Sequence, residues 1–232
     1  MSTALVLAMV GAYGVLADSE AVKTANWAYS EVKNVKISSA DFSASHDGPD
    51  FKTYIGLNAV VYSLDSKEYT MDWEDFVCPT PDRCIPIYEC QGANPEIAKV
   101  VEANVALTLI ALLIMFRRVK TENDSDCVKF VSLIFMIAAI VSGAISVGLF
   151  LDDCYSDLVE LKSFTALQVL ANEPPLNITG DVTYEMGSGY LCVICALALQ
   201  VFSTLIALFQ PVPDASVGSQ YESILKVSFD EV

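Results

Sequence analysis

Four apolar runs, separated by polar segments, dominate the chain. They cover residues 3–17, 100–116, 130–151 and 190–209. A helix needs about 20 mostly apolar residues, within a range of roughly 17 to 25, to cross the hydrocarbon core of a bilayer. The last two runs reach this length directly, and the second reaches it if its helix begins near Ile97. The pattern predicts transmembrane helices over residues 1–22, 97–117, 129–151 and 188–210.

The first run is the shortest, and two interpretations fit it. It has the apolar core of a secretory signal peptide, with Val15 and Ala17 at the −3 and −1 positions before Asp18. The residues ahead of this core include no Lys or Arg, which argues against a signal peptide. We therefore expect a retained helix that continues toward Val22, whereas cleavage would leave three spans.

Basic residues at the ends of the spans predict the topology. Arg117, Arg118 and Lys120 follow the second run, and Lys129 opens the third. Because Lys and Arg near span ends favour the cytoplasmic side, the loop 118–128 is expected inside. Segments 23–96 and 152–187 are then extracellular, and both termini, including the tail 211–232, are cytoplasmic. The expected location is the plasma membrane or an endomembrane.

The first outer segment is long enough for a small sheet. Residues 51–64 are rich in β-branched and aromatic side chains, and 67–73 follow after a turn at Asp65-Ser66. Together they predict a hairpin, and the alternation of polar and apolar residues in 31–37 predicts a further strand. The predicted fold class is a membrane all-α four-helix bundle with a small extracellular antiparallel sheet.

Charge and composition narrow the function. The 232 residues are 53% hydrophobic and 18% charged, with a net charge of −16 that lies mostly in the two outer segments. This excess of acidic residues excludes a nucleic-acid binder. It fits a solvated ectodomain surface, or a rim that attracts cations. With one His, no Gly-rich phosphate loop and no nucleophile elbow, the sequence predicts a non-enzyme without a cofactor.

The cysteines favour an extracellular location for the outer segments, and the sequon at Asn177 is consistent with it. Cys78, Cys84, Cys90 and Cys154 give an even number on the oxidising side, which allows three pairings. We expect one bridge inside the first outer segment and one that joins it to Cys154. A zinc site is the competing interpretation, but spacings of six residues fit no usual zinc pattern. Asn177, in an Asn-Ile-Thr sequon, is a glycosylation candidate.

Two features of the spans suggest specific roles. Asn94-Pro95 predicts the start of the second helix, which places Glu102 in its outer turns as an intramembrane acid. Lys99 or water would satisfy this acid if it has no functional role. The third span also carries two small-xxx-small pairs that permit close helix approach, within the bundle or between copies. These residues are Ala139, Gly143, Ala144 and Gly148.

The tail carries two short motifs. Tyr221 and Ile224 fit a tyrosine-based sorting signal, which adaptors bind as an extended strand. Asp230 and the terminal Val232 fit a ligand of PDZ domains. The alternative is a solvated tail without a partner.

This topology resembles the claudin and peripheral-myelin-protein superfamily. Trp27 after the first span and Gly56-Leu57 in the expected strand match residues of its pattern. Asn58 stands where that family has a tryptophan, and Val61 stands where it has its first cysteine. The resemblance implies a left-handed four-helix bundle with an extracellular sheet, which acts in junctions, in adhesion or as an auxiliary channel subunit.

The leading prediction is a non-enzymatic four-span protein with a structural, junctional or auxiliary-subunit role. Its expected partners are membrane lipid and other membrane proteins. The alternative is a pore-forming subunit of a homo-oligomeric channel, which would need a polar stripe along one helix. The third and fourth spans offer few polar residues for such a stripe.

Overall fold

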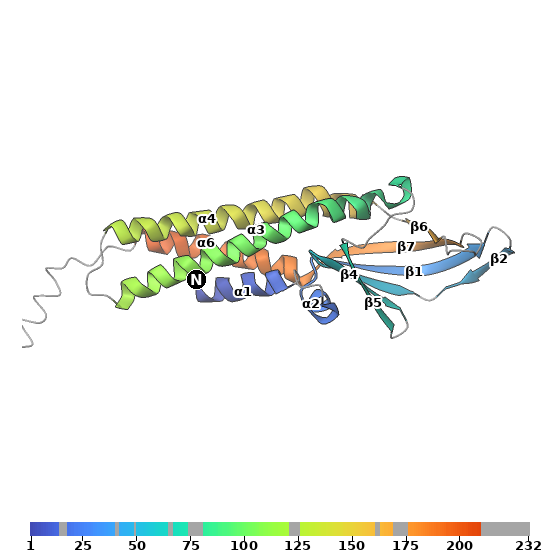
Figure 1. The fold of residues 1–232 in the computed structure, drawn as a ribbon, viewed down its shortest axis with the longest axis horizontal. Coiled ribbons are helices and arrows are strands. Elements are labelled where there is room, and N and C mark those ends of the chain that lie inside the picture. Colours follow the sequence, from blue (N-terminus) through green and yellow to red (C-terminus); the bar gives the residue numbers. More distant parts are fainter. Residues whose placement is uncertain are drawn as a thin grey trace, which may run out of the picture.

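The computed structural model describes residues 1–13, 18–39, 42–48, 50–64, 67–73, 81–120, 126–160, 163–168 and 176–209. Within these residues, helices fill one end of the molecule and a β-sheet fills the other (Figure 1). The long helices are α1 (Ser2–Tyr13), α3 (Pro81–Lys120), α4 (Asp126–Phe150) and α6 (Ser188–Phe209). α1 packs against α6 and α3, α3 packs against α4, and α4 packs against α6.

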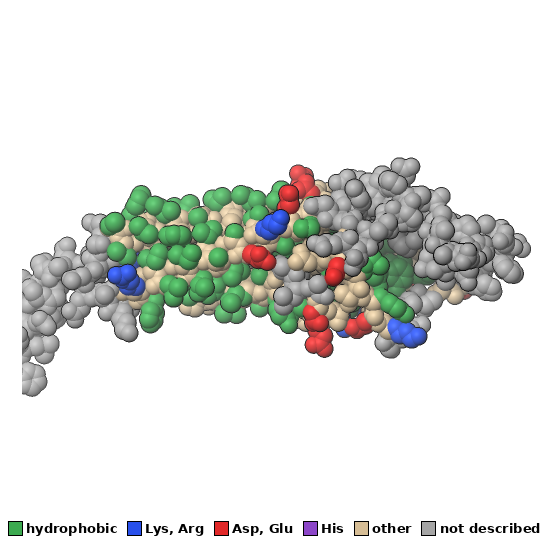
Figure 2. All heavy atoms as spheres, in the orientation of Figure 1, with side chains coloured by type: hydrophobic (Ala, Val, Ile, Leu, Met, Phe, Trp, Pro, Cys, Tyr) green, Lys and Arg blue, Asp and Glu red, His purple; other side chains and the backbone are tan. Residues whose placement is uncertain are grey.

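Three helical segments are long and apolar enough to cross a membrane. They are Ala93–Arg118, Cys127–Val159 and Ser188–Phe209, with mean hydropathies of 2.0, 2.5 and 2.5. Their outward side chains form an apolar surface along the helices on the face seen in Figure 2. Because so large an apolar surface is unfavourable in water, these helices indicate a membrane protein. The described α1 has 12 residues, fewer than a full span requires.

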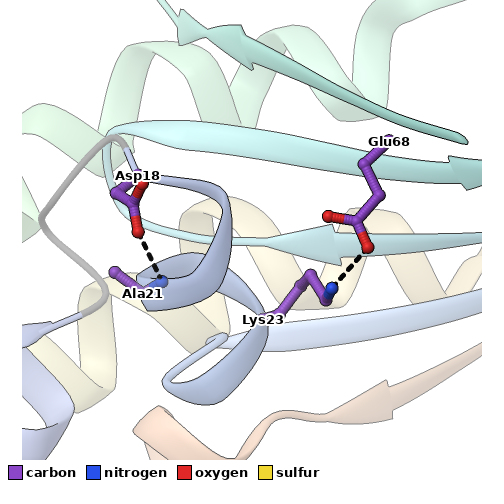
Figure 3. Close-up of polar contacts among 4 residues, drawn as sticks. All are labelled: Asp18, Ala21, Lys23 and Glu68. Carbon is purple, nitrogen blue, oxygen red and sulfur yellow. Dashed lines mark hydrogen bonds and ion pairs between the residues drawn. The ribbon is translucent and has the colours of Figure 1, made fainter.

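The first helix differs from the expected one. A single helix from the N-terminus to Val22 is wrong, because α2 (Ser19–Thr24) is a separate helix. Asp18 caps its N-terminus by accepting a hydrogen bond from the backbone N–H of Ala21 at 3.3 Å (Figure 3). Val22 then packs on Ala59 and Val61 of the sheet. The polar residues Ser19 and Glu20 after the first apolar run therefore belong to a helix that packs on the sheet.

The start of α3 also differs. The predicted helix start at Asn94 is wrong, because α3 begins at Pro81 and runs through Pro95 without a break. A proline inside a helix removes one backbone hydrogen bond. Tertiary contacts of Cys90 and Asn94 hold the turns before it in place. α3 therefore extends 12 residues, about 18 Å, beyond Ala93 toward the sheet.

The described strands form one antiparallel sheet in the order β5-β4-β3-β1-β7-β6, with β2 beside β1. The strands are β1 (Ala28–Ser39), β2 (Phe42–Asp47), β3 (Phe51–Ile55), β4 (Ala59–Leu64), β5 (Lys67–Asp72), β6 (Ser163–Gln168) and β7 (Leu176–Met186). The predicted antiparallel sheet is confirmed. The single hairpin expected over 51–73 is wrong, because residues 56–58 turn the chain between β3 and β4 and create a three-strand meander.

The second outer segment supplies two strands that the sequence analysis did not predict. β7 pairs with β1 from Ala28 opposite Met186 to Ser39 opposite Leu176, and β6 pairs with β7. α4 leads into this segment through the π-helical turn η2 (Leu151–Tyr155) and α5 (Ser156–Glu160). The described strands of segments 23–96 and 152–187 therefore form one sheet.

Candidate functional site

The link between the sheet and the helices centres on Trp27, which lies just before β1 and is fully buried. Its indole Nε1 donates a hydrogen bond to the Gly11 carbonyl oxygen of α1 at 3.1 Å. Its ring meets Phe150 of α4 and Tyr190 of α6 edge-on, with centroids 5.1 and 5.7 Å apart. Such pairs stabilise by about 0.5–1.5 kcal/mol beyond the area they bury. One side chain thus ties the first strand to three helices.

A second contact joins α3 to the turn between β3 and β4. The Gly56 carbonyl oxygen accepts hydrogen bonds from Trp73 Nε1 at 3.1 Å and from Asn94 Nδ2 at 3.3 Å. Both donor side chains are buried, at 2% and 0% exposure. A buried backbone carbonyl needs such partners because water cannot reach it. The three-strand meander is therefore held against α3 at the turn that contains Asn94.

The start of α6 lies against the residue before Trp27. Gly187 N–H donates to the Trp27 carbonyl at 2.9 Å, and Gly189 N–H donates to the Asn26 carbonyl at 2.8 Å. Asn26 Oδ1 accepts a further hydrogen bond from the Ser188 backbone N–H at 3.1 Å. A Cβ on Gly187 would lie 2.1 and 2.2 Å from two oxygens of Asn26. Only glycine permits this close approach.

A disulfide bond completes the contacts between the sheet and the helices, which together are called the junction below. Cys90 of α3 pairs with Cys154 of η2, and both residues are fully buried beside Phe150 and Leu158. This confirms the predicted bridge between the two outer segments. The bridge spans 64 residues of chain, for which a stabilisation of about 2–5 kcal/mol is typical. The junction therefore has one continuous core of aromatic, aliphatic and sulfur side chains.

A buried polar network connects α3, α4 and α6 at a level farther from the sheet than the junction. Gln200 Nε2 of α6 donates to Thr108 Oγ1 at 2.8 Å and to Asn104 Oδ1 at 3.3 Å. Asn104 Nδ2 donates to the Ala139 carbonyl of α4. Asn104, Thr108 and Gln200 are 3%, 0% and 1% exposed. The network joins three helices and satisfies polar groups that hydrocarbon would leave unpaired.

The small residues of α4 divide into two sets. Ala139 and Gly143 are buried, and a Cβ on Gly143 would lie 2.9 Å from Asn104 Nδ2. Ala144 and Gly148 are exposed, and a Cβ on Gly148 would meet nothing within 4 Å. The first pair therefore permits close packing inside the chain. The second pair lies on the outward surface, so of the two alternatives it fits packing between copies and not packing inside the bundle.

Charged side chains fasten α2 to the edge of the sheet. Lys23 of α2 forms an ion pair with Glu68 of β5 (Figure 3), and this hydrogen bond raises the pKa of Lys23. On β1, Glu31 pairs with Lys33 at 2.8 Å, which lowers the pKa of Glu31. All four groups are at least partly exposed to solvent, so salt screens these pairs.

Two tyrosines of the sheet pack against the core of the junction. Burial raises the pKa of both Tyr62 and Tyr184 to about 12. Their phenols are therefore neutral at physiological pH. Among the described residues, no three His, Cys, Asp or Glu side chains are placed to hold a metal ion. The packing of these tyrosines against the junction helps to hold the sheet in position.

The other predicted site residues are placed only in part. Glu102 is exposed on α3. Cys84 and Asn177 lie in α3 and β7, where only their backbone is described. Outside the described residues lie Cys78, Tyr221, Ile224, Asp230 and Val232.

No protein-family model matches the chain, and no curated protein matches it significantly.

Proposed function

We propose that the chain is a non-enzymatic four-span membrane protein whose acidic, disulfide-bonded ectodomain acts as a structural, adhesive or auxiliary-subunit surface. Three spans correspond to α3, α4 and α6. The proposal takes α1 as the fourth, because α1 packs along α6 and α3. With Arg117, Arg118 and Lys129 at one end of the helices, the positive-inside rule puts both termini in the cytoplasm.

The observation that carries this proposal is the core that the sheet and the helices share. Trp27, the Gly56 carbonyl and the disulfide attach the sheet to every long helix of the described chain. A domain that only tethered a flexible binding module would not need three such attachments. The sheet is instead held in a fixed position against the helices, which suits a protein that presents a surface to another protein.

The pore alternative has less support. Polar side chains in the described spans, such as Asn104, Thr108 and Gln200, point into the helix contacts and bond one another. The large side chains on the outward surface are apolar over most of the spans. A pore between copies needs a polar stripe on that outward surface, and the described helices offer none along their length.

The test is the mass and composition of the complex after gentle detergent extraction from native membranes. A stoichiometric, larger membrane-protein partner supports the auxiliary-subunit role. A monomer that concentrates at cell contacts supports adhesion. A homogeneous ring built only of this chain contradicts the proposal and supports the pore.

Topology and modification are tested separately. An epitope after Val232 should be detected only in permeabilised cells, and Asn177→Gln should remove a glycan-dependent mass shift. Detection of the epitope on intact cells would overturn the topology. Binding of the tail to a PDZ domain or a sorting adaptor should need Val232 and Tyr221, respectively.

A further inference from the structure

Glu102 is a charged side chain on the outward surface of a membrane span. It lies in the segment Ala93–Arg118 and is exposed, beside the exposed Ala103 and Ala106. Farther along the same helix, Leu109 is 42% exposed. Figure 2 shows charged side chains gathered where the apolar helices meet the sheet. How deeply Glu102 lies decides whether water can solvate it.

Helix geometry places Glu102 inside the hydrocarbon core. Arg117 follows it by 15 residues, which is about 22 Å along the helix, and the core is about 30 Å thick. With Arg117 at the inner boundary, the Glu102 backbone lies about 8 Å inside the outer boundary.

The neighbouring helices give a similar depth. Asn104, two residues after Glu102, bonds Ala139, which follows Lys129 by ten residues, or about 15 Å. Asn104 therefore lies near the middle of the bilayer. With Asn104 about 15 Å from the outer boundary, the Glu102 backbone, two residues nearer to that boundary, lies about 12 Å inside it.

No cation of the described chain neutralises Glu102. Its carboxylate forms no ion pair with any described residue, Lys99 one turn away included. Side chains on a helix tilt toward its N-terminus, which for α3 is the outer end. The Lys99 side chain therefore points away from Glu102, toward the outer boundary. The Glu102 carboxylate reaches at most about 5 Å, one helical turn, nearer to water than its own backbone. A charged group left in hydrocarbon is strongly disfavoured unless it finds a partner.

We propose that Glu102 is the docking point for a membrane helix of a different protein, which carries one Lys or Arg 8–12 Å inside the outer boundary. The partner's cation pairs with the Glu102 carboxylate, while Ala103 and Ala106 let the two helices approach closely. The inference rests on the proposed auxiliary role and topology, and it defines the chemistry of the partner.

A second copy of this chain does not fit the site. At the same depth, the described outward residues of the other long spans include Val141 and Ala144 of α4 and Ile194 and Cys195 of α6, none of which is a cation. Two copies that met along α3 would place Lys99 beside Lys99, because a two-fold axis along the membrane normal keeps the helices parallel. The complementary charge must therefore come from another protein.

The experiment uses the full chain, co-expressed with a probe helix that crosses the membrane once. A lysine cluster at the cytoplasmic end of the probe fixes its direction across the membrane. One probe is rich in leucine and carries a single Arg about 10 Å inside the outer boundary, and its control carries Leu there. We expect at least tenfold more Arg probe than Leu probe to co-purify in mild detergent. Glu102→Gln should abolish this preference.

Matched variants separate docking from misfolding. Glu96→Gln removes an exposed acid of α3 nearer the sheet and should keep the preference. Glu102→Lys should instead select a probe that carries Asp. Equal recovery of both probes with the wild-type chain, or a preference that persists in Glu102→Gln, overturns the proposal. A native partner without a basic residue at this depth also overturns it, while leaving the auxiliary role intact.

Discussion

Two glycines on α4, five residues apart, should respond in opposite directions to the same substitution. The methyl group of Gly143→Ala would lie 2.9 Å from Asn104 Nδ2 and 3.3 Å from Leu197 Cδ1. Asn104 cannot turn away freely, because its amide bonds both Ala139 and Gln200. The methyl group of Gly148→Ala meets no atom within 4 Å.

The magnitudes follow from two opposing terms. Overpacking a well-packed site costs about 1–3 kcal/mol. Replacing glycine by alanine inside a helix stabilises by up to about 1 kcal/mol. Gly143→Ala should therefore destabilise by up to about 2 kcal/mol. Gly148→Ala should be neutral or stabilising by up to about 1 kcal/mol.

The assay is reversible unfolding of each purified variant in mixed micelles, with increasing fractions of denaturing detergent. The midpoint of Gly143→Ala should fall below that of the wild type, and the midpoint of Gly148→Ala should equal or exceed it. If both variants shift equally, or Gly148→Ala is the less stable, the inward and outward assignment of the α4 residues is refuted. Restored stability in Gly143→Ala combined with Asn104→Ala would show that the clash is with Asn104.

The junction gives three further predictions. Cys154→Ser should add one thiol, that of Cys90, to those that a maleimide labels in the denatured, unreduced protein; an unchanged count would exclude the bridge. Trp27→Ala should destabilise by about 3–5 kcal/mol in the same unfolding assay, whereas Trp27→Phe should cost much less because a ring remains; equal effects would show that packing of the ring is unimportant. Folding raises the pKa of Tyr62 and Tyr184 from 10.0 to about 12, so both favour the neutral phenol in the folded state. Their contribution to stability is complete below pH 10 and is lost between pH 10 and 12. Phenylalanine at both positions should weaken this pH dependence, as followed by unfolding and tyrosinate absorbance, and an unchanged profile would contradict the burial of the phenols.

Three of the four predicted spans and the inter-segment disulfide could be predicted from the sequence because each depends on a strong local signal. Long apolar runs have few alternatives, and an outer Cys154 must find a partner from the other outer segment. The same kind of local signal also indicates strand β7, although the sequence analysis did not use it. Ile178, Val182 and Tyr184 alternate with polar residues, as expected for a strand with one buried face.

Other features depend on contacts between residues distant in sequence. Asn94-Pro95 has the local pattern of a helix start, but the bond to Gly56 and the disulfide at Cys90 keep the preceding turns helical. The aromatic contacts of Trp27 with Phe150 and Tyr190 join three segments, and no pattern in one segment shows them.

The continuity of α3 links the two proposals physically. One helix carries Glu102 in the membrane and, eight and twelve residues earlier, Asn94 and Cys90 at the junction. These separations are about 12 and 18 Å along an unbroken helix. Gly56 and Cys154 attach that helix to the meander and to the end of α4. A partner helix that shifts α3 as one rigid body at Glu102 would also move the sheet or strain the junction, which would couple the proposed binding in the membrane to the position of the sheet.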